Sequence, residues 1–260
     1  MLDKFPILRA TREGIKEMED IVVKEFHLTI VLNDRELVTL LCTPEKLDFL
    51  AIGFLFSEGL INDKDDIKKI DLDVEGNLVR VATKKPQKFP KDILSRRLIG
   101  SSGGRGASPF AGIDPGLKID TSIYVSPSEV LDLVDQFVHR SGLFESTGGV
   151  HSAALCDTRS ILVFSEDIGR HNAIDKVFGE CLLKDIPIHD RLLVTSGRVS
   201  SEILSKAAKR RIPLLISKSA PTNLGVQLAN ELGITLIGFV REKRMNIYTH
   251  RWRVLSHGKG

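Results

Sequence analysis

The chain has 260 residues, of which 42% are hydrophobic and 27% are charged, a composition that fits a soluble globular protein of one large or two small domains. The formal net charge of +3 suits an anionic small ligand but is too weak to indicate nucleic acid binding. The three cysteines lie far apart, and neither a signal-peptide core nor a run of ~18 apolar residues is present, so we expect no disulfide framework, no membrane span and a cytoplasmic location.

The first part of the chain predicts two hairpins and a helix between them. Residues 26–32 and 36–41 alternate apolar with other side chains and are expected to pair around a short turn. Thr43, followed by a proline, predicts the cap of a helix, and Gly59 is expected to end that helix. A second hairpin is predicted across residues 70–81.

A glycine-rich segment follows at residues 100–116, and its density of glycine and proline predicts a loop. Such long loops are usually functional or disordered. We place the domain boundary there, which gives an N-terminal α+β domain at residues 1–115 and a second domain at residues 116–260.

The second domain is expected to alternate strands and helices. Ser126 predicts the cap of a helix that ends near Gly142. The alternation that follows predicts a largely parallel or mixed sheet with helices on its faces. Strands are expected at residues 152–155, 161–164, 192–195, 213–217 and 234–240, and helices at residues 172–183, 200–209 and 223–232.

Polar residues gather where four of these strands end. In open α/β sheets, ligands bind in the crevice outside the carboxyl ends of the strands. Arginine side chains and helix N-termini at such an edge suit phosphate or pyrophosphate, although each residue alone also fits an ordinary loop or cap. The residues in question are Arg170, His171, Ser196, Arg198, Ser217, Lys218, Ser219, Arg241 and Arg244.

Two further groups leave alternatives open. Gly149 and His151 suggest a close backbone approach to a ligand, or a strand entry with a buried histidine. Glu166 and Asp167 could form an acid–base set with His171, but capping of the following helix is the simpler interpretation. No cysteine pair has metal-ligand spacing, so no metal site is predicted. Phosphate-loop, dinucleotide-fingerprint and zinc-deaminase motifs are also absent from the sequence.

Six ordered segments together give the chain a family resemblance. The sequence resembles the FdhD/NarQ-type formate dehydrogenase accessory proteins over about residues 28–250. The matching segments are 41–44 with 50–60, 147–154, 166–176, 195–202, 219–222, and 238–241 with 245–249.

The resemblance implies a cytidine-deaminase-like three-layer α/β domain with a smaller N-terminal α+β domain, usually in a homodimer. It implies that sulfur passes from a cysteine desulfurase to the molybdenum (or tungsten) cofactor, in its bis(molybdopterin guanine dinucleotide) form, before insertion into the formate dehydrogenase catalytic subunit. No nucleic acid or membrane partner is expected. The family's cofactor-contacting segment maps onto Phe239, Val240, Arg241, Glu242, Lys243 and Arg244. With the strand-end residues, we assign cofactor binding also to Ser196, Gly197, Arg198, Lys218, Ser219, Arg170, His171, Gly149 and His151.

The chain departs from the family at the sulfur carrier. Gly103 holds the place of the carrier cysteine, and sulfur transfer requires a thiolate. The cysteines that are present, Cys42, Cys156 and Cys181, are expected to be small buried apolar residues. Three functions therefore remain open: a sulfur carrier that uses another cysteine, a non-catalytic cofactor-binding chaperone, and a deaminase-like hydrolase of nucleotides.

Overall fold

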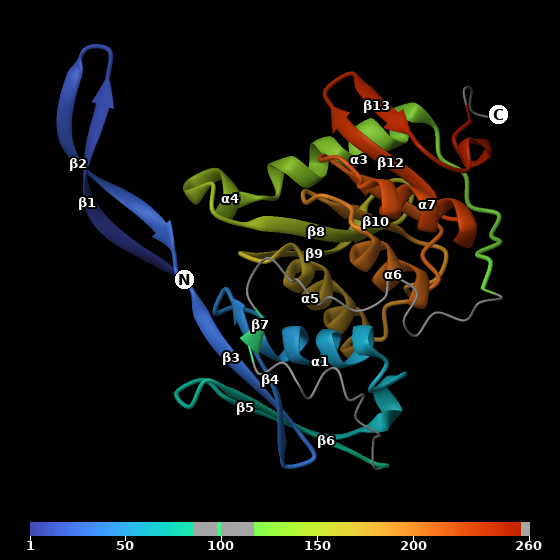
Figure 1. Cartoon of the computed structure of the whole chain (residues 1–260), viewed down its shortest axis with the longest axis horizontal. Helices are drawn as coiled ribbons and strands as arrows, with labels where there is room; N and C mark the ends of the chain where they lie inside the picture. The colour runs from blue at the N-terminus through green and yellow to red at the C-terminus, as the bar shows by residue number, and fades with distance from the viewer. Residues whose placement is uncertain (86–97, 100–116, 256–260) are drawn as a thin grey trace.

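The computed structural model describes residues 1–85, 98–99 and 117–255, and their strands form three β-sheets (Figure 1). A two-stranded ribbon comes first in the chain, a five-stranded sheet follows, and a six-stranded sheet occupies the second half. No helix within these ranges is long and apolar enough to cross a membrane.

The five-stranded sheet has the order β5-β6-β3-β4-β7 and contains both predicted hairpins, which are confirmed. The preceding ribbon was not predicted, because its apolar residues fall on both faces and give no clean alternation. The elements of this half are β1 Leu2–Thr11, β2 Gly14–Val23, β3 Phe26–Leu32, β4 Arg35–Cys42, α1 Leu47–Glu58, a 3₁₀ turn at Lys64–Asp66, β5 Ile67–Asp73, β6 Leu78–Thr83 and β7 Leu98–Ile99.

The six-stranded sheet has the order β13-β12-β11-β10-β8-β9. Strands β10, β11 and β12 pair in parallel and the others pair antiparallel, so the predicted mixed sheet is confirmed. Its elements are α3 Pro127–His139, α4 Gly142–Thr147, β8 His151–Cys156, β9 Ile161–Asp167, α5 Arg170–Leu183, β10 Leu192–Thr195, α6 Ser201–Lys209, β11 Leu214–Ser217, α7 Asn223–Leu232, β12 Thr235–Arg241, β13 Arg244–Ile247 and a 3₁₀ turn at Arg251–Arg253.

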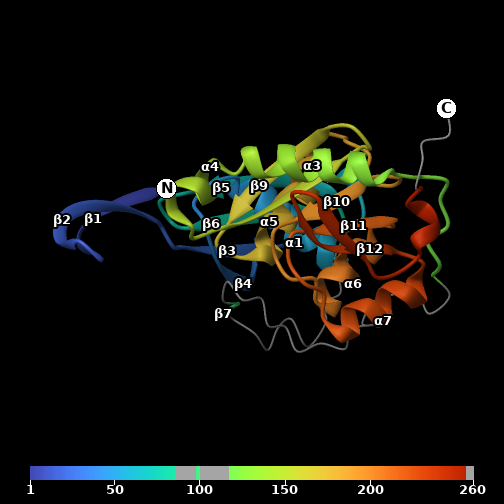
Figure 2. The same ribbon diagram turned by 90° about the horizontal axis from the view of Figure 1, so that it is seen from above.

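Alternate strand residues of this sheet enter different cores, because successive side chains of a strand point to opposite faces. Leu193 and Leu215 join the core that contains α5, α6 and α7, whereas Val194 and Ile216 join the core beneath α3. Helices therefore cover both faces, as Figure 2 shows for α3 on one side and α6 and α7 on the other. The expected α/β fold with three layers is confirmed.

Helix α1 joins the two halves by lying directly against α5 (Figure 1). A Cβ atom at Gly53 would lie 1.7 Å from the carbonyl oxygen of Asp175, and one at Gly179 would lie 1.9 Å from that of Phe49. Only glycine permits this backbone approach. One continuous apolar core then runs from the five-stranded sheet to α7. The predicted boundary after residue 115 lies outside the described residues and stays a prediction.

The predicted start of α1 is wrong. Thr43 does not cap the helix; the residue before α1 is Lys46, which has a left-handed backbone and no side-chain cap bond. Thr43 is buried and binds Asp167 instead, so a distant partner outweighs the local capping signal. Gly59 ends the helix and Ser126 forms a capping box on α3, as predicted.

Candidate functional site

The carboxyl ends of four strands meet at one edge of the six-stranded sheet. Strand β9 is antiparallel to β8, and β8 is antiparallel to β10, so β9 runs in the same direction as β10, β11 and β12. Strand β8 begins at this edge, which brings its first residue, His151, to the same place. The expected gathering of strand ends is confirmed, and a cavity lies there.

The cavity has a volume of about 820 Å³ and lies between this edge and helices α3 and α4. It is within the range of ordinary small-molecule sites. Eight of the residues assigned to cofactor binding line it: Gly149, His151, Ser196, Lys218, Ser219, Val240, Arg241 and Glu242. The polar part of the cavity combines hydroxyls with two cations, Lys218 and Arg241, and two carboxylates, Asp135 and Glu242. The two cations can bind an anionic group, and the carboxylates can accept hydrogen bonds from another part of a ligand.

The apolar wall of the cavity was not predicted from the sequence. Helices α3 and α4 supply it, with Phe144 contributing an exposed aromatic ring. Val134 and Phe137, which are buried in the core beneath α3, also line the cavity. The signal was present in α3, where Leu131 and Val138 widen the apolar stripe beyond what the core needs. An apolar wall opposite a polar rim that carries Lys218 and Arg241 fits a ligand with a ring at one end and phosphate at the other.

Two arginines add positive charge beside the cavity without lining it. Burial lowers the pKa of His151 below its usual range, and the charges of Arg170 and Arg198 lower it further. The pKa of Arg170 is lowered in turn by burial and by Arg198. Gly197 lies under the Arg170 side chain, since a Cβ there would lie 2.9 Å from the Arg170 Cβ atom. Burial and the two arginines therefore favour the neutral form of the histidine.

The remaining assigned residues lie outside the cavity lining. The His171 side chain is 2% exposed, with its Nε2 atom 3.6 Å from a carboxylate oxygen of Glu202. Phe239 lies in an irregular stretch of the β12–β13 pairing with a left-handed backbone. Lys243 and Arg244 follow that irregularity, which directs Arg241 and Glu242 rather than these two to the cavity. Cofactor binding by residues in and outside the cavity stays a prediction.

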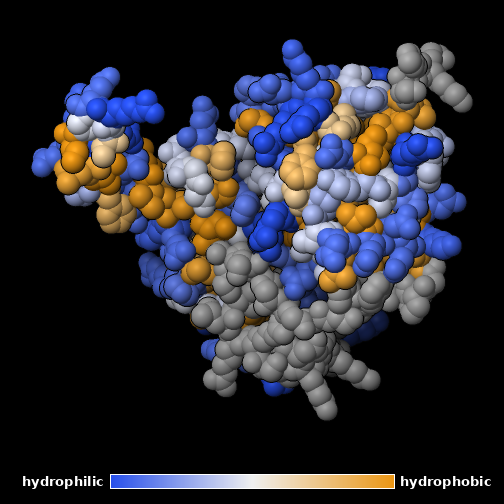
Figure 3. All heavy atoms as spheres, turned by 45° about the horizontal axis from the view of Figure 1, so that its top comes forward, coloured by the Kyte–Doolittle hydropathy of each residue, from blue (hydrophilic) through white to orange (hydrophobic). Residues whose placement is uncertain are grey.

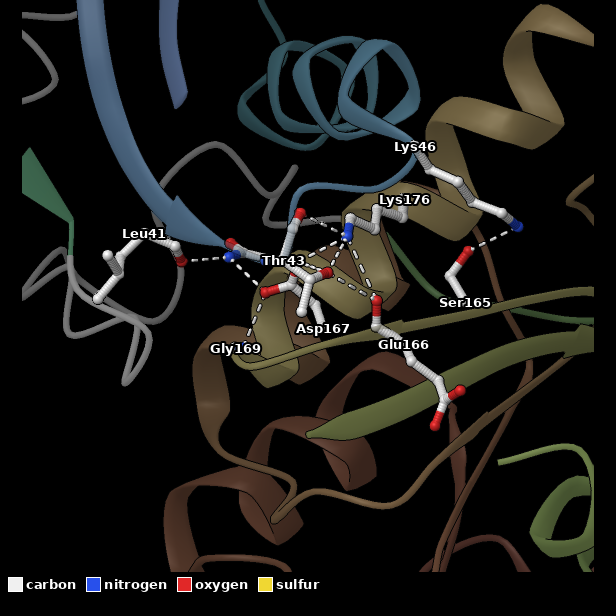
Figure 4. Close-up of polar contacts among 9 residues, drawn as sticks. Leu41, Thr43, Lys46, Ser165, Glu166, Asp167, Gly169 and Lys176 are labelled. Carbon is white, nitrogen blue, oxygen red and sulfur yellow. Dashed lines mark hydrogen bonds and ion pairs between the residues drawn. The ribbon is translucent and has the colours of Figure 1, made fainter. Parts of the chain in front are cut away.

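Asp167 is the centre of a buried polar cluster and does not cap α5, whose cap position is Gly169. One carboxylate oxygen accepts hydrogen bonds from the Gly169 backbone and the Asn172 amide, both at 2.9 Å. The other oxygen accepts bonds from the backbone and hydroxyl of Thr43 and lies 2.7 Å from the Lys176 Nζ atom (Figure 4). The cluster fastens the end of β4 to the β9–α5 turn.

Glu166 has a different role, because its side chain points away from this cluster (Figure 4). Its carboxylate accepts hydrogen bonds from the backbone N–H groups of Leu143 and Phe144 at the start of α4. Burial raises its pKa above the ordinary range, against the effect of these bonds. Glu166 therefore binds the first turn of α4, which forms part of the cavity wall. It does not cap α5, as the sequence had predicted.

All three cysteines are buried, as expected. Burial is the first cause that raises the pKa of each thiol, to about 12 for Cys42, Cys156 and Cys181. Thiolate is therefore scarce near neutral pH, and its fraction grows about tenfold per pH unit. Within the described residues, no group of His, Cys, Asp or Glu is arranged to hold a metal ion.

The thiols are expected to resist alkylation in the folded protein. Iodoacetamide near neutral pH should leave all three unmodified over the time in which the unfolded chain is labelled completely, because only the exposed thiolate reacts. Mass spectrometry counts the alkyl groups in the native and denatured samples. Rapid labelling of one cysteine in the native sample would contradict the burial of that thiol.

Comparison with known proteins gives a consistent result along the whole chain. The model of the FdhD/NarQ family matches residues 23–255. A Bacillus subtilis (strain 168) protein named sulfur carrier protein FdhD is 46% identical over 250 residues, which are 95% of each chain. A Staphylococcus aureus (strain MRSA252) protein of the same name is 38% identical and covers 96% of each chain. The crystal structure of a formate dehydrogenase accessory protein from Desulfotalea psychrophila superposes with a TM-score of 0.79 at 26% identity, covering 98% of this chain and 99% of that one.

Proposed function

Because the chain belongs to the FdhD/NarQ family, we propose that it is a sulfur carrier protein that supports the activity of a formate dehydrogenase. The observation that carries this proposal is the match to relatives named sulfur carrier protein over nearly their full length. These names favour the carrier over a chaperone that only binds cofactor. The partners that follow are a cysteine desulfurase as sulfur donor and the catalytic subunit of the dehydrogenase.

The cavity at the strand ends is the proposed place for the sulfur acceptor, the bis(molybdopterin guanine dinucleotide) cofactor. Its apolar wall suits a flat ring, and Lys218 and Arg241 suit a pyrophosphate. A volume of about 820 Å³ is within the range for one small ligand, so we assign one nucleotide half of the cofactor to it rather than both. Neutral His151 can donate or accept a hydrogen bond there without adding charge.

The carrier step requires a thiolate on this chain. That thiolate attacks the outer sulfur of the donor's persulfide, a new S–S bond forms, and the donor's cysteine leaves as a thiolate. Since every thiol of the resting protein is buried, the proposal requires that docking of the donor exposes one of them. Cys42 is the first candidate, because it ends β4, whose Leu40 pairs with Ile99 immediately before the glycine-rich segment. Gly103, in that segment, lies outside the described residues.

The test is to load the protein with a cysteine desulfurase and free cysteine and then measure the intact mass. We expect the wild type to gain the mass of one sulfur atom and the Cys42→Ser variant to gain none. Cys156→Ser and Cys181→Ser are matched controls that should still load. If no cysteine gains sulfur, and a variant without cysteines still activates the dehydrogenase, the carrier proposal is wrong and a cofactor-binding role replaces it.

A further inference from the structure

Arg210 carries a charge that is partly withdrawn from water. Hydrophilic side chains, drawn in blue, cover much of the surface of the body in Figure 3, where water stabilises their charges. The Nε atom of Arg210, in contrast, is buried and has no hydrogen-bond partner among the described residues. Burial lowers the pKa of Arg210 to about 10, and no carboxylate of the described residues offsets this effect. Because a buried charge is costly unless a counter-charge meets it, Arg210 is placed to bind an anion.

Arg210 lines a groove with a volume of about 590 Å³, which is within the range of small-molecule sites. Its guanidinium stacks on Phe56, with 3.6 Å between the Cζ atom and the ring centroid. Lys209 and Arg211 line the same groove and give it three successive cations. The rest of the floor is mainly apolar and is formed by Leu182, Ile186, Pro187 and Ile188.

The carboxylates of the groove do not neutralise the buried part of Arg210. They belong to Asp63, Asp65 and Asp185. The side chains of Asp65 and Asp185 are 98% and 71% exposed, and each lies beside a lysine. Asp63 accepts a hydrogen bond from the backbone of its own turn. Since water and salt screen exposed charges strongly, the cationic side of the groove stays available to a ligand.

The end of a helix accounts for only part of this arrangement. Cations near a helix C-terminus complement its dipole, and Arg210 donates a hydrogen bond of 2.8 Å to the Phe56 carbonyl oxygen at the end of α1. Arg211, however, has a left-handed backbone with a φ of 54°, just after α6, where glycine is favoured. An arginine at this position strains the backbone without serving the helix, which indicates that its side chain has a use in the groove.

We propose that this groove binds a small molecule that carries a phosphate group. A phosphate monoester has a charge of about −1.5 to −2 near pH 7, which three successive cations match better than they match a single carboxylate. The planar guanidinium of an arginine binds phosphate oxygens with two parallel hydrogen bonds. The apolar floor takes the remaining part of the molecule.

The groove is separate from the cavity at the strand ends. Helix α5 begins at Arg170, beside the cavity, and Leu182 near its other end lines the groove. At about 1.5 Å per residue, these two positions are about 18 Å apart along the helix. The cavity and the groove share no lining residue, so the two sites can be occupied at the same time.

Phenyl phosphate is the probe for the groove, and phenylglyoxal, which modifies exposed arginines, reports where it binds. Arg211 is exposed, and its modification in the wild type should slow severalfold when phenyl phosphate is added. Arg159 is exposed on the β8–β9 turn and lines neither site, so its rate should stay unchanged in the same sample. Peptide mass spectrometry measures both rates. Inorganic phosphate should need about tenfold higher concentration for the same protection, because it has no ring to bury.

The Arg211→Gly variant separates ligand binding from folding. Because glycine is favoured with a left-handed backbone, this variant should melt at or above the wild-type temperature without ligand, and it should gain less from phenyl phosphate. Arg159→Ala is the matched control and should keep the full gain. Any binding in the strand-end cavity contributes equally to the wild type and to both variants, so the difference measures the groove.

Unchanged modification of Arg211 at millimolar phenyl phosphate would overturn the proposal. Equal protection by inorganic phosphate would overturn it as well, because the apolar floor would then have no part in binding. So would a lower melting temperature of Arg211→Gly, which would assign the arginine to the fold. None of these outcomes depends on sulfur loading or on the dehydrogenase, so this inference and the proposed function fail separately.

Discussion

Replacing Asp167 with alanine is expected to lower the free energy of unfolding by about 3–5 kcal/mol, because it leaves a buried ammonium without its counter-charge. The Lys176 side chain is 1% exposed and that of Asp167 is fully buried. The substitution also removes the acceptor for Thr43, Gly169 and Asn172. Urea unfolding followed by circular dichroism measures the change.

Two control variants distinguish the effect of breaking the buried Asp167–Lys176 ion pair from the effect of removing a charge in general. Asp65→Ala removes a carboxylate that is 98% exposed and 3.8 Å from Lys84, and such surface pairs contribute about 0–1 kcal/mol. Asp167→Ala combined with Lys176→Met removes both charges and should recover part of the loss, because no buried charge is left uncompensated. A loss from Asp167→Ala no greater than that from Asp65→Ala would refute the role given to this cluster.

The Asp167 cluster also shows where sequence reasoning stops. The segment from Ser165 to Lys176 concentrates charged residues at a strand-to-helix turn, and this pattern alone indicates a ligand site. In the structure Asp167, Asn172 and Lys176 bind the end of β4 instead. Thr43 is 124 residues away in the sequence, and nothing local in either segment reveals that the two meet.

Local signals, in contrast, were sufficient for most of the fold. Strand alternation, the capping box at Ser126 and the stop at Gly59 depend on neighbouring residues only, and each is confirmed. The edge at which the carboxyl ends of the strands meet was predictable, because the direction of each strand follows from its alternation with helices. The cavity wall from α3 and the ribbon were not, since both depend on which apolar residues stay uncovered after packing.

Arg241→Ala is expected to weaken the binding of GDP, as a probe for half of the proposed cofactor, by about 10- to 100-fold. A hydrogen bond between a charged side chain and an anion contributes about 1.5–3 kcal/mol, and each 1.4 kcal/mol is about tenfold in affinity. Arg241 lines the cavity at the end of β12. Calorimetric titration of the wild type and the variant gives the ratio of dissociation constants, and Lys218→Ala should weaken binding as well.

Arg244 is the matched control, because it is paired with Arg241 across the β12–β13 turn but does not line the cavity. Both substitutions remove one positive charge from the same turn, so a general electrostatic attraction for GDP would weaken equally in both. A specific contact in the cavity predicts a large effect for Arg241→Ala and a small one for Arg244→Ala. Equal effects would move the nucleotide site away from the cavity. The opposite order would place it at Lys243 and Arg244, to which the family resemblance also assigns cofactor binding.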